Sequence, residues 1–190
     1  SHIETLVNNG EFATDSSFYR VSHLGDGSDF VIQGGPSDSS STLGQFNDEY
    51  NTNLQFTTAG LLAMAKSSDD TNDSQIFVTG GPARFLDFQH SIFGVLTEGN
   101  AVRNAIQQSR TTGDGAPPQP ITITSAQIIT DTQNAALQLK AAEGASGTSN
   151  VTLTVSDAQG HTYSQTFAVT VSPDTANSAP FLNPVAPVTA

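Results

Sequence analysis

The sequence predicts a mainly β fold that includes a few short helices. Short apolar runs such as Phe30–Gln33 and Gln75–Thr79 are separated by loops rich in glycine, serine and aspartate, which is typical of strands joined by turns. Farther along, the runs Asn150–Ser156 and Tyr163–Ser172 alternate apolar and polar residues, as half-buried strands do. Charged residues make up only 13% of the chain, and uncharged polar residues and glycine dominate instead, as in secreted β-rich proteins.

The length and charge of the chain limit its possible partners. Its 190 residues suffice for one domain or for two small ones. The 18 acidic residues exceed the 6 basic ones, and the resulting net charge of -12 disfavours nucleic acids and anionic membranes as partners. No apolar run approaches the roughly 20 residues of a membrane-spanning helix. Because the chain has no cysteine, disulfides, thiolate zinc sites and thiol nucleophiles are excluded.

The first third of the chain predicts a helix end followed by two strands. In Ile3–Gly10 the apolar residues share one face and the glycine provides a stop signal, so this segment is expected to end a helix. Phe18–Val21 and Phe30–Gln33 are expected to be strands. The segment Ser22–Asp29 between them is rich in glycine and aspartate and predicts a connecting loop.

The middle of the chain predicts further short strands and one helix. Three apolar runs are short enough to be buried strands: Gly60–Ala65, Gln75–Thr79 and Ser91–Leu96. Asn100 is expected to cap a helix whose apolar positions, at helical spacing, are Ala101, Val102, Ala105 and Ile106. Prolines end this helix, and the alternating run Ile121–Ile128 predicts one more strand.

The composition changes near Thr130, and this change predicts a second β region. From there to the end of the chain Lys140 is the one basic residue. Three alternating runs predict strands: Ala135–Ala141, Asn150–Ser156 and Tyr163–Ser172. Asp157–Gly160 predicts a tight turn between the last two. The pattern is typical of part of an antiparallel β-sandwich, and the proline-rich stretch 173–190 predicts a linker.

Five segments in the first part of the chain resemble one family. The run Phe18–Val21 (FYRV) followed by Phe30–Gly35 (FVIQGG) resembles the cyclophilin signature F-H-R-V…F-M-I-Q-G-G. Gly60–Ala65 (GLLAMA) resembles the family's G-x-L-S-M-A, and Asp70–Thr79 (DTNDSQIFVT) resembles its N-T-N-G-S-Q-F-F-I-T. Phe85–Gly94 (FLDFQHSIFG) is similar to its W-L-D-G-K-H-x-x-F-G. The segments occur in the family's order over residues 3–128.

The resemblance implies an eight-stranded antiparallel β-barrel with a helix at each end and peptidyl-prolyl cis-trans isomerase activity. We expect residues 1–128 to form a cyclophilin-like domain that lacks the family's first strands and most of its first helix. Residues 129–172 resemble the second half of a cadherin-like or immunoglobulin-like repeat of bacterial surface proteins. A cyclophilin domain set inside such a repeat, with the missing parts of both upstream of Ser1, accounts for this arrangement. The expected location is the cell surface, the periplasm or the extracellular space.

Cis-trans isomerisation of an X–Pro bond requires few chemical groups from the protein. Rotating an X–Pro bond breaks amide resonance, with a barrier of about 18–20 kcal/mol, and the twisted prolyl nitrogen is more basic than the planar one. No bond between heavy atoms is made, so no nucleophile, metal or cofactor is required. A cation aimed at that nitrogen favours the twisted form over the planar one. An apolar pocket is also needed to hold the proline ring.

The resemblance assigns the cation to Arg20 and an orienting role to Gln33. A guanidinium stays charged and has a rigid fork of donors, which suits the task. Gln33 is expected to orient Arg20 and to hold a substrate carbonyl. The alternatives are an ordinary surface arginine and an ordinary polar residue on a strand.

The resemblance also assigns a substrate pocket. Its expected wall residues are Phe30, Val31, Phe77, Phe85, Leu86 and His90. The alternative for the apolar ones is plain core packing. His90 is expected to be neutral and to serve as a ring wall, and Phe85 stands where the family usually has tryptophan, which implies weak binding of cyclosporin. Ala65 and Lys66 are expected to offer backbone groups to an extended proline-containing peptide, although the family usually has asparagine in place of Lys66.

Two further expectations concern charge. Asp26 and Asp29 in the predicted loop are expected to lie beside Arg20 and to weaken its field or to select basic substrates. The aspartates Asp69, Asp70 and Asp73 lack the ligand order of a calcium-binding EF-hand loop, and the four histidines show no metal-binding spacing, so no metal site is expected.

Three hypotheses about function remain open from the sequence. The leading one is an isomerase that acts on X–Pro bonds of exported or surface proteins, with neighbouring repeats of the same parent chain as partners. The second is a peptide-binding or adhesive surface module without turnover. The third is that this stretch does not fold stably alone.

Overall fold

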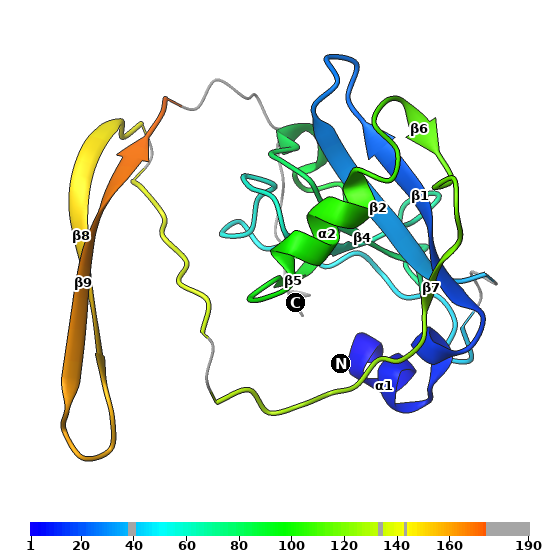
Figure 1. Ribbon diagram of the computed structural model, residues 1–190, viewed down its shortest axis with the longest axis horizontal. Coiled ribbons are helices and arrows are strands. Elements are labelled where there is room, and N and C mark those ends of the chain that lie inside the picture. Colours follow the sequence, from blue (N-terminus) through cyan, green and yellow to red (C-terminus); the bar gives the residue numbers. More distant parts are fainter. Residues whose placement is uncertain (38–40, 133–134, 143, 174–190) are drawn as a thin grey trace, which may run out of the picture. The chain divides into compact units, whose positions relative to one another are not determined.

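The computed structural model describes residues 1–37, 41–132, 135–142 and 144–173, and the chain divides into two compact units (Figure 1). The first unit is built on Ser1–Ala136, and the second begins at Leu137. Apart from Pro173, the predicted linker 173–190 lies outside the described residues.

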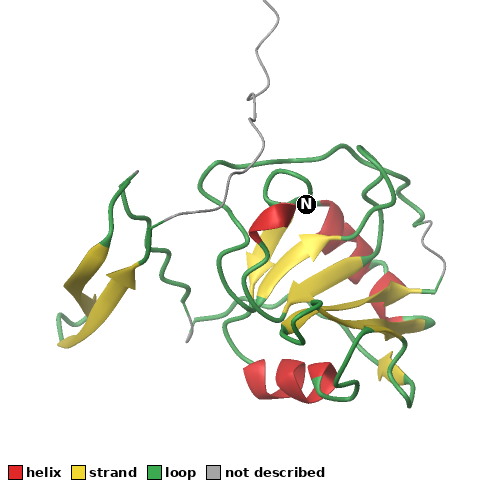
Figure 2. Ribbon diagram, turned by 90° about the horizontal axis from the view of Figure 1, so that it is seen from above, coloured by secondary structure: helices red, strands yellow, loops and turns green. Residues whose placement is uncertain are grey.

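The first unit is built around one antiparallel sheet (Figure 2). Within the described residues the sheet has seven strands, in the order β5-β3-β4-β2-β1-β6, and β7 also pairs with β1. The strands are β1 (Ser16–His23), β2 (Asp29–Pro36), β3 (Leu61–Met64), β4 (Ile76–Thr79), β5 (Ile92–Val95), β6 (Asp114–Gly115) and β7 (Ile121–Ile123). The mainly β prediction is confirmed. The resemblance implied an eight-stranded barrel that here lacks its first strands, and within the described chain the hydrogen-bonded path ends at β5 on one side and at β6 and β7 on the other.

The hairpin of β1 and β2 is longer than the sequence predicted. The segment Ser22–Asp29 was expected to be a loop, but Ser22 and His23 continue β1 and Asp29 begins β2. Ser22 and His23 are buried, with 3% and 8% exposed, and β2 and the segment around Gly113 pair with their backbone. Ladder pairing therefore outweighs the loop preference of serine at this position.

Close contact between β1 and β2 requires a glycine at position 34. A Cβ atom on Gly34 would lie 2.7 Å from the carbonyl oxygen of Ser17 on β1, which is too close for any other residue without a backbone shift. This explains why the Gly-Gly pair follows the predicted strand Phe30–Gln33.

The two faces of the sheet carry separate apolar clusters. Val31 and Ile32 are neighbours on β2 and point to opposite faces, as alternation in a strand requires. One cluster contains Val31, Phe56, Ala63, Phe77 and Ala83. The other contains Val21, Ile32 and Val78, and Ile106 of the second helix packs against it. The first cluster lies on the face that carries the predicted site residues.

The first helix, α1 (His2–Asn8), overlaps the predicted helix end Ile3–Gly10 and begins with a capping box. The Ser1 hydroxyl accepts from the Glu4 amide, and the Glu4 side chain reaches back to the backbone of Ser1. Leu6 is fully buried. The short 3-10 helix η1 (Glu11–Ala13) follows, and Gly10 precedes it with a left-handed φ of 75°.

The second helix, α2 (Asn100–Gln107), has a different cap and a different buried face from those predicted. Gly99, with a φ of 80°, is the N-cap, so Asn100 is the first helical residue. Val102 is 63% exposed, whereas Arg103 and Gln107 are buried. The Gln107 side-chain amide donates to the Ser22 carbonyl at 2.8 Å and ties the helix to β1. Among the described residues, no helix has the length and apolar character needed to cross a bilayer.

The predicted strand Ile121–Ile128 is much shorter in the structure. β7 covers only Ile121–Ile123 and pairs with residues Phe18 to Ser16 of β1. Since β1 begins at Ser16, the residues after Ile123 have no further backbone of β1 to pair with. The alternation of apolar and polar residues continues to Ile128, but the hydrogen-bonded pairing with β1 ends at Ile123.

The second unit contains an antiparallel hairpin of β8 (Gly147–Ser156) and β9 (Thr162–Val171). The predicted turn at Asp157–Gly160 is confirmed, since the Asp157 and Gly160 amides donate to the carbonyls of His161 and Asp157. The predicted strand Ala135–Ala141 is wrong, because residues 135–142 take no regular structure. Two of its apolar side chains, Leu137 and Leu139, remain 50% and 48% exposed.

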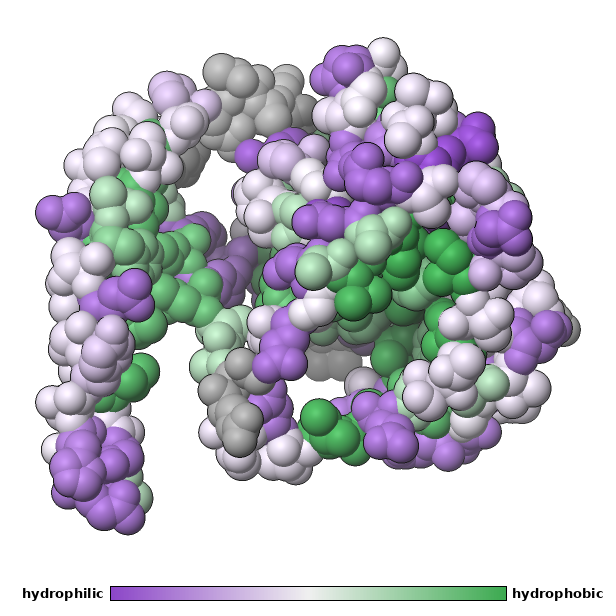
Figure 3. All heavy atoms as spheres, viewed as in Figure 1, coloured by the Kyte–Doolittle hydropathy of each residue, from purple (hydrophilic) through white to green (hydrophobic). Residues whose placement is uncertain are grey.

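The hairpin has one hydroxyl face and one apolar face. Cross-strand hydroxyl pairs lie 2.7–2.9 Å apart on the first face: Thr148 with Thr170, Thr152 with Thr166 and Thr154 with Ser164. The register places apolar residues together on the other face: Val151, Leu153, Val155, Tyr163 and Phe167. Figure 3 shows apolar residues gathered along the hairpin.

Candidate active site

The predicted catalytic pair, Arg20 and Gln33, lies on adjacent strands of the first unit. Arg20 of β1 is directly opposite Gln33 of β2, and Gln33 is directly opposite Phe77 of β4. Phe77 in turn is opposite Ala63 of β3. Because directly opposite residues share a face, these side chains form one row across the sheet. The row joins a cation to the apolar cluster on that face.

A β-bulge at Tyr19 brings a further residue to this row. Phe18 pairs with Gly34 and Arg20 pairs with Gln33, so Tyr19 is an extra residue with no partner in the ladder. In a regular strand Tyr19 and Arg20 would point to opposite faces. Here both reach Gln33, since Arg20 Nη1 donates to Gln33 Oε1 at 2.8 Å and Gln33 Nε2 donates to the Tyr19 hydroxyl at 2.7 Å.

The hydrogen-bond chain extends beyond Arg20 and Tyr19 at both ends. The Tyr19 hydroxyl donates to Gln75 Oε1 at 2.8 Å, and burial raises the pKa of Tyr19, which keeps this proton in place. At the other end, Arg20 Nε and Nη2 donate to the two carboxylate oxygens of Asp114 at 2.8 and 2.9 Å. The hydrogen bond to Asp114 raises the pKa of Arg20, and the same bond lowers the pKa of Asp114. Arg20 is therefore a permanent cation with a fixed carboxylate partner.

Asp114 takes the place that the sequence assigned to Asp26 and Asp29. Asp26 accepts hydrogen bonds from the amide and hydroxyl of Ser28, at 2.9 and 2.6 Å. Asp29 lies 3.3 Å from the His23 side chain. Neither supplies the contact to Arg20, because β6 pairs Asp114 with Ser22 of β1, across 94 residues of sequence from Arg20. The only local signal was the Gly-Asp-Gly run at 113–115, which stands shortly before the prolines that end the predicted helix.

The predicted pocket residues are brought together on the same face. Val31 and Phe77 belong to the buried cluster, and Phe30, Ala65 and Leu86 pack against it. Phe56, which sequence reasoning did not single out, is fully buried and stacks on Phe77 with ring centroids 5.8 Å apart. Phe77 is therefore fixed by its packing against Phe56 in the core.

The half-buried Phe30 and the exposed Phe85 extend this surface. The rings of Phe30 and Phe85 lie 5.4 Å apart, and Phe85 is 54% exposed. Phe85 belongs to the 3-10 helix η2 (Arg84–Leu86), which also carries Leu86. The arrangement provides an apolar wall that is open to solvent on one side.

His90 meets Phe77 edge to face and is held by the backbone. The two rings lie 5.3 Å apart at 87°, and His90 Nδ1 is 2.9 Å from the Met64 carbonyl oxygen. A carbonyl can only accept, so Nδ1 carries the proton and donates. Burial lowers the pKa of His90, which keeps the ring neutral at neutral pH.

Ala65 and Lys66 are placed beside the row, but with partners of their own. The Ala65 amide donates to the Gln75 carbonyl at 2.9 Å, so an extended peptide would not use this N–H. The Lys66 ammonium pairs with Asp48 and lies 3.3 Å from the Tyr50 hydroxyl, and only 6% of the lysine side chain is exposed. The lysine side chain thus anchors the loop that contains Asp48.

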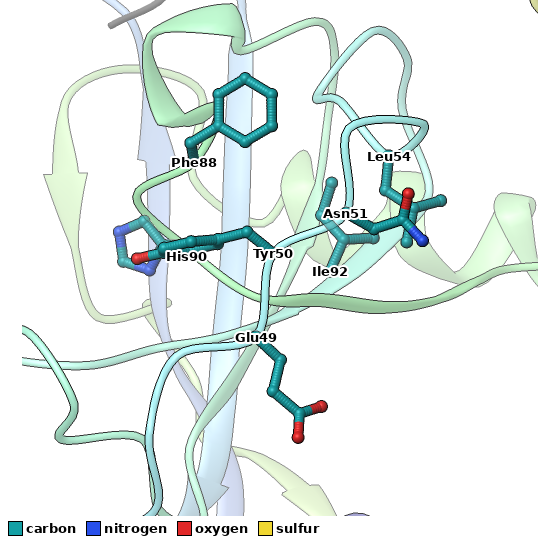
Figure 4. Close-up of a pocket in the computed structure, with 7 residues that line it drawn as sticks. All are labelled: Glu49, Tyr50, Asn51, Leu54, Phe88, His90 and Ile92. Carbon is teal, nitrogen blue, oxygen red and sulfur yellow. The ribbon is translucent and has the colours of Figure 1, made fainter. Parts of the chain in front are cut away.

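Two cavities adjoin the site. The larger one, of about 200 Å³, is polar and shares Gln33 and Gln75 with the hydrogen-bond chain. Its lining residues are Gln33, Gln45, Ala65, Lys66, Ser67, Thr71, Asp73 and Gln75. The smaller one, of about 10 Å³, is close to the lower limit for one water molecule. Figure 4 shows His90 and Tyr50 among its lining side chains.

Comparison with known proteins agrees with this geometry. A family model described as cyclophilin type peptidyl-prolyl cis-trans isomerase/CLD matches residues 3–128. Peptidyl-prolyl cis-trans isomerase-like 1 of Homo sapiens is 39% identical over 104 residues, which are 52% of this chain and 63% of that protein. Peptidyl-prolyl cis-trans isomerase A of Mycobacterium tuberculosis is 36% identical over 124 residues, which are 63% of this chain and 65% of that protein. The chain thus spans less than two thirds of the length of these relatives.

A solved structure shares the fold of the first unit. It is a crystal structure of a cyclophilin type peptidyl-prolyl cis-trans isomerase from Cryptosporidium parvum in the presence of the dipeptide Ala-Pro. The TM-score is 0.59 at 26% sequence identity, and the match covers 68% of this chain and 84% of that chain.

Proposed function

Because the chain belongs to the cyclophilin-type peptidyl-prolyl cis-trans isomerase family, we propose that its first unit catalyses rotation about X–Pro peptide bonds. The main support is the row that joins Arg20 and Gln33 to Phe77 across the sheet. A fixed cation beside an apolar surface is what this reaction requires. The bound substrate is a proline-containing peptide or protein segment.

The proposed mechanism relies on electrostatic stabilisation of the twisted amide and on binding of the proline ring. The proline ring lies against the apolar wall of Phe77, Phe30 and Leu86, while Gln33 helps to hold a neighbouring carbonyl. As the amide twists, its nitrogen gains a lone pair, and the Arg20 guanidinium stabilises that state more than the planar one. Neutral His90 contributes a ring wall and takes no proton. Each 1.36 kcal/mol of such differential stabilisation gives about a tenfold rate increase.

The test is catalysed cis-trans isomerisation of a proline tetrapeptide by the full chain. We expect Arg20→Ala to lower kcat/KM by about 100-fold, the usual cost of removing one preorganised donor. Lys140→Ala removes the same charge from the second unit and serves as the control, with wild-type activity expected. A wild-type rate no higher than the uncatalysed one, or an unchanged rate in Arg20→Ala, would contradict the proposal.

We further propose that the substrates are exported or surface proteins. The support is compositional: charged residues make up only 13% of the chain, and its polarity comes mostly from uncharged polar residues and glycine, as in secreted β-rich proteins. Protease treatment of intact cells that produce the protein is the direct test. Cleavage of the protein while cytosolic markers stay intact is expected, and full protection would contradict an external location.

The second unit supports an additional structural role within a cadherin-like or immunoglobulin-like repeat. The apolar face of the hairpin leaves Leu153 and Val155 41% and 54% exposed, and a two-stranded hairpin alone is at best marginally stable. Packing against a second sheet would bury that face, as in a β-sandwich. Neighbouring repeats of the same parent chain are the proposed partners.

This structural role also defines the second candidate function, a peptide-binding or adhesive surface module without turnover. It predicts that proline peptides bind the full chain with the same affinity before and after Arg20→Ala, with no catalysed isomerisation in either case. Catalysis that depends on Arg20 would exclude it.

A further inference from the structure

The carboxylate of Asp114 is the partner of Arg20 that the sequence did not predict. We infer that Asp114 is a positioning residue, which fixes the direction of the Arg20 guanidinium at the site of X–Pro rotation. This inference rests on the proposed isomerase function of the same site.

The contact geometry constrains the guanidinium on two edges. Nε and Nη2 of Arg20 donate to the two oxygens of Asp114, at 2.8 and 2.9 Å, which is the parallel two-bond arrangement that guanidinium and carboxylate groups favour. Nη1 donates to Gln33 at 2.8 Å. All three nitrogens are thus engaged, and the plane of the group cannot turn without breaking at least one bond.

Gln33 and Asp114, the two hydrogen-bond partners of the Arg20 guanidinium, are themselves held in place. Gln33 is fixed through Tyr19 and Gln75 by hydrogen bonds of 2.7 and 2.8 Å. Asp114 is fixed through its backbone, because β6 pairs it with Ser22 of β1. Next to it, the His23 amide donates to the Gly113 carbonyl at 2.8 Å. The strand that carries Arg20 therefore also sets the position of Asp114.

The pair is too exposed to serve mainly as a stabiliser of the fold. The side chains of Arg20 and Asp114 are 33% and 53% exposed, and exposed ion pairs contribute little to folding stability. The ion pair can still matter for catalysis, because stabilisation of the transition state by the Arg20 guanidinium depends strongly on the orientation of that group. We therefore expect the loss of Asp114 to affect turnover more than stability or substrate affinity.

The first experiment uses Asp114→Asn in the full chain with the proline tetrapeptide assay. Asparagine keeps the size of the side chain but replaces one acceptor by an N–H group, which would face a guanidinium donor. We expect kcat to fall about tenfold while KM changes by less than about twofold. Asp26→Asn is the matched control, since Asp26 is bonded to Ser28 and lies outside the row.

A double-mutant cycle separates positioning from a structural effect. If Asp114 acts through Arg20, adding Asp114→Asn to Arg20→Ala costs nothing further in kcat/KM. If the loss caused by Asp114→Asn has the same size in the Arg20→Ala background, the inference is overturned.

A second readout does not depend on activity. The Nε–H group of Arg20 should give a distinct, slowly exchanging NMR signal in the wild-type chain, and Asp114→Ala, which removes both acceptors, should remove it. The Nε–H signal of Arg84, which is paired with Asp87, is the internal control and should not change. An unchanged Arg20 signal in Asp114→Ala overturns the inference. If the wild-type chain shows no catalysis, the proposed function fails, while this NMR comparison still decides the role of Asp114.

Discussion

At the scale of single residues, the bulge at Tyr19 determines which side chains form hydrogen bonds with Gln33. It places two consecutive side chains of β1 on the same face, so that a phenol and a guanidinium both bond Gln33. Without the extra residue, alternation would send one of them to the opposite face. The orientation of Gln33 therefore depends on Tyr19 as well as on Arg20.

Replacing Tyr19 tests this dependence. In Tyr19→Phe the ring remains, but Gln33 Nε2 loses its acceptor and Gln75 loses its donor. A hydrogen bond contributes about 1 kcal/mol, so kcat/KM for a proline tetrapeptide should fall about fivefold. Tyr163→Phe in the exposed hairpin provides the control and should retain full activity. Equal activity of the two variants would show that the hydroxyl of Tyr19 does not orient Gln33.

The neutral state of His90 predicts a pH dependence of stability. Burial lowers the pKa of His90 from its ordinary 6.5. Between the folded and the unfolded pKa values the unfolded chain binds more protons, so the stability gained from this group is complete above about pH 6.5 and is lost as pH falls through the folded pKa. Urea unfolding from pH 8 to 5 should therefore show a steeper fall in the free energy of unfolding for the wild type than for His90→Gln. A similar slope in both would contradict a lowered pKa.

The sequence predicted the site well where residues belong to contiguous motifs. Arg20, Gln33 and Phe77 stand in short runs whose order is characteristic, and the sheet register brings them into one row. Asp114 was missed because its contact depends on pairing between β1 and β6, which no local pattern encodes. The same limit explains why Asp26 was assigned wrongly, since closeness in sequence was taken as closeness in space.

At the scale of elements, α2 shows how polar residues can form a buried face. The prediction from apolar spacing put Val102 inside, yet the helix packs through Gln107, which is fully buried. The hydrogen bond from Gln107 Nε2 to the Ser22 carbonyl satisfies the amino group of this buried amide, whereas its Oε1 has no hydrogen-bond partner among the described residues. Periodicity weighs only apolar residues and cannot anticipate a glutamine whose partner lies 85 residues away.

Two substitutions in α2 test this packing. Gln107→Ala should lower the free energy of unfolding by about 1–3 kcal/mol, because the buried Ser22 carbonyl loses its side-chain donor. Val102→Ala on the exposed face should change it by less than about 0.5 kcal/mol. Urea denaturation of both variants measures the difference. A larger effect of Val102→Ala than of Gln107→Ala would instead support the buried face that the apolar spacing predicted.

Strand lengths were harder to predict than strand positions. The short apolar runs located β1 to β5, but the ends of each strand depend on the partner strand. β1 extends through Ser22 and His23 because β2 and β6 pair with them, whereas β7 stops at Ile123 because β1 provides no further backbone.

At the scale of the whole molecule, the two units differ in how much they bury. The first unit encloses fully buried residues such as Phe56 and Leu6, while the described hairpin residues are mostly exposed. Composition alone indicated the change in character near Thr130. It did not indicate that Ala135–Ala141 would remain without a strand partner in the described chain.

This difference predicts uneven hydrogen exchange in the full chain. Amides of β2 and β4, which lie inside the large sheet, should exchange slowly at rates set by global unfolding. Amides of β8 and β9 should exchange at least tenfold faster, because little apolar burial opposes their opening. Mass-spectrometric hydrogen exchange measures both in one experiment. Equal protection of the two regions would indicate that another surface covers the hairpin.

The two-faced hairpin has a consequence for strand alignment. A slip of one residue between β8 and β9 would bring hydroxyls such as that of Thr152 opposite apolar side chains such as that of Phe167. Every hydroxyl pair would be lost at once, and the apolar stripe would be divided between both faces. The alternation of threonine with valine and leucine therefore disfavours a one-residue slip of the hairpin before any partner sheet is present.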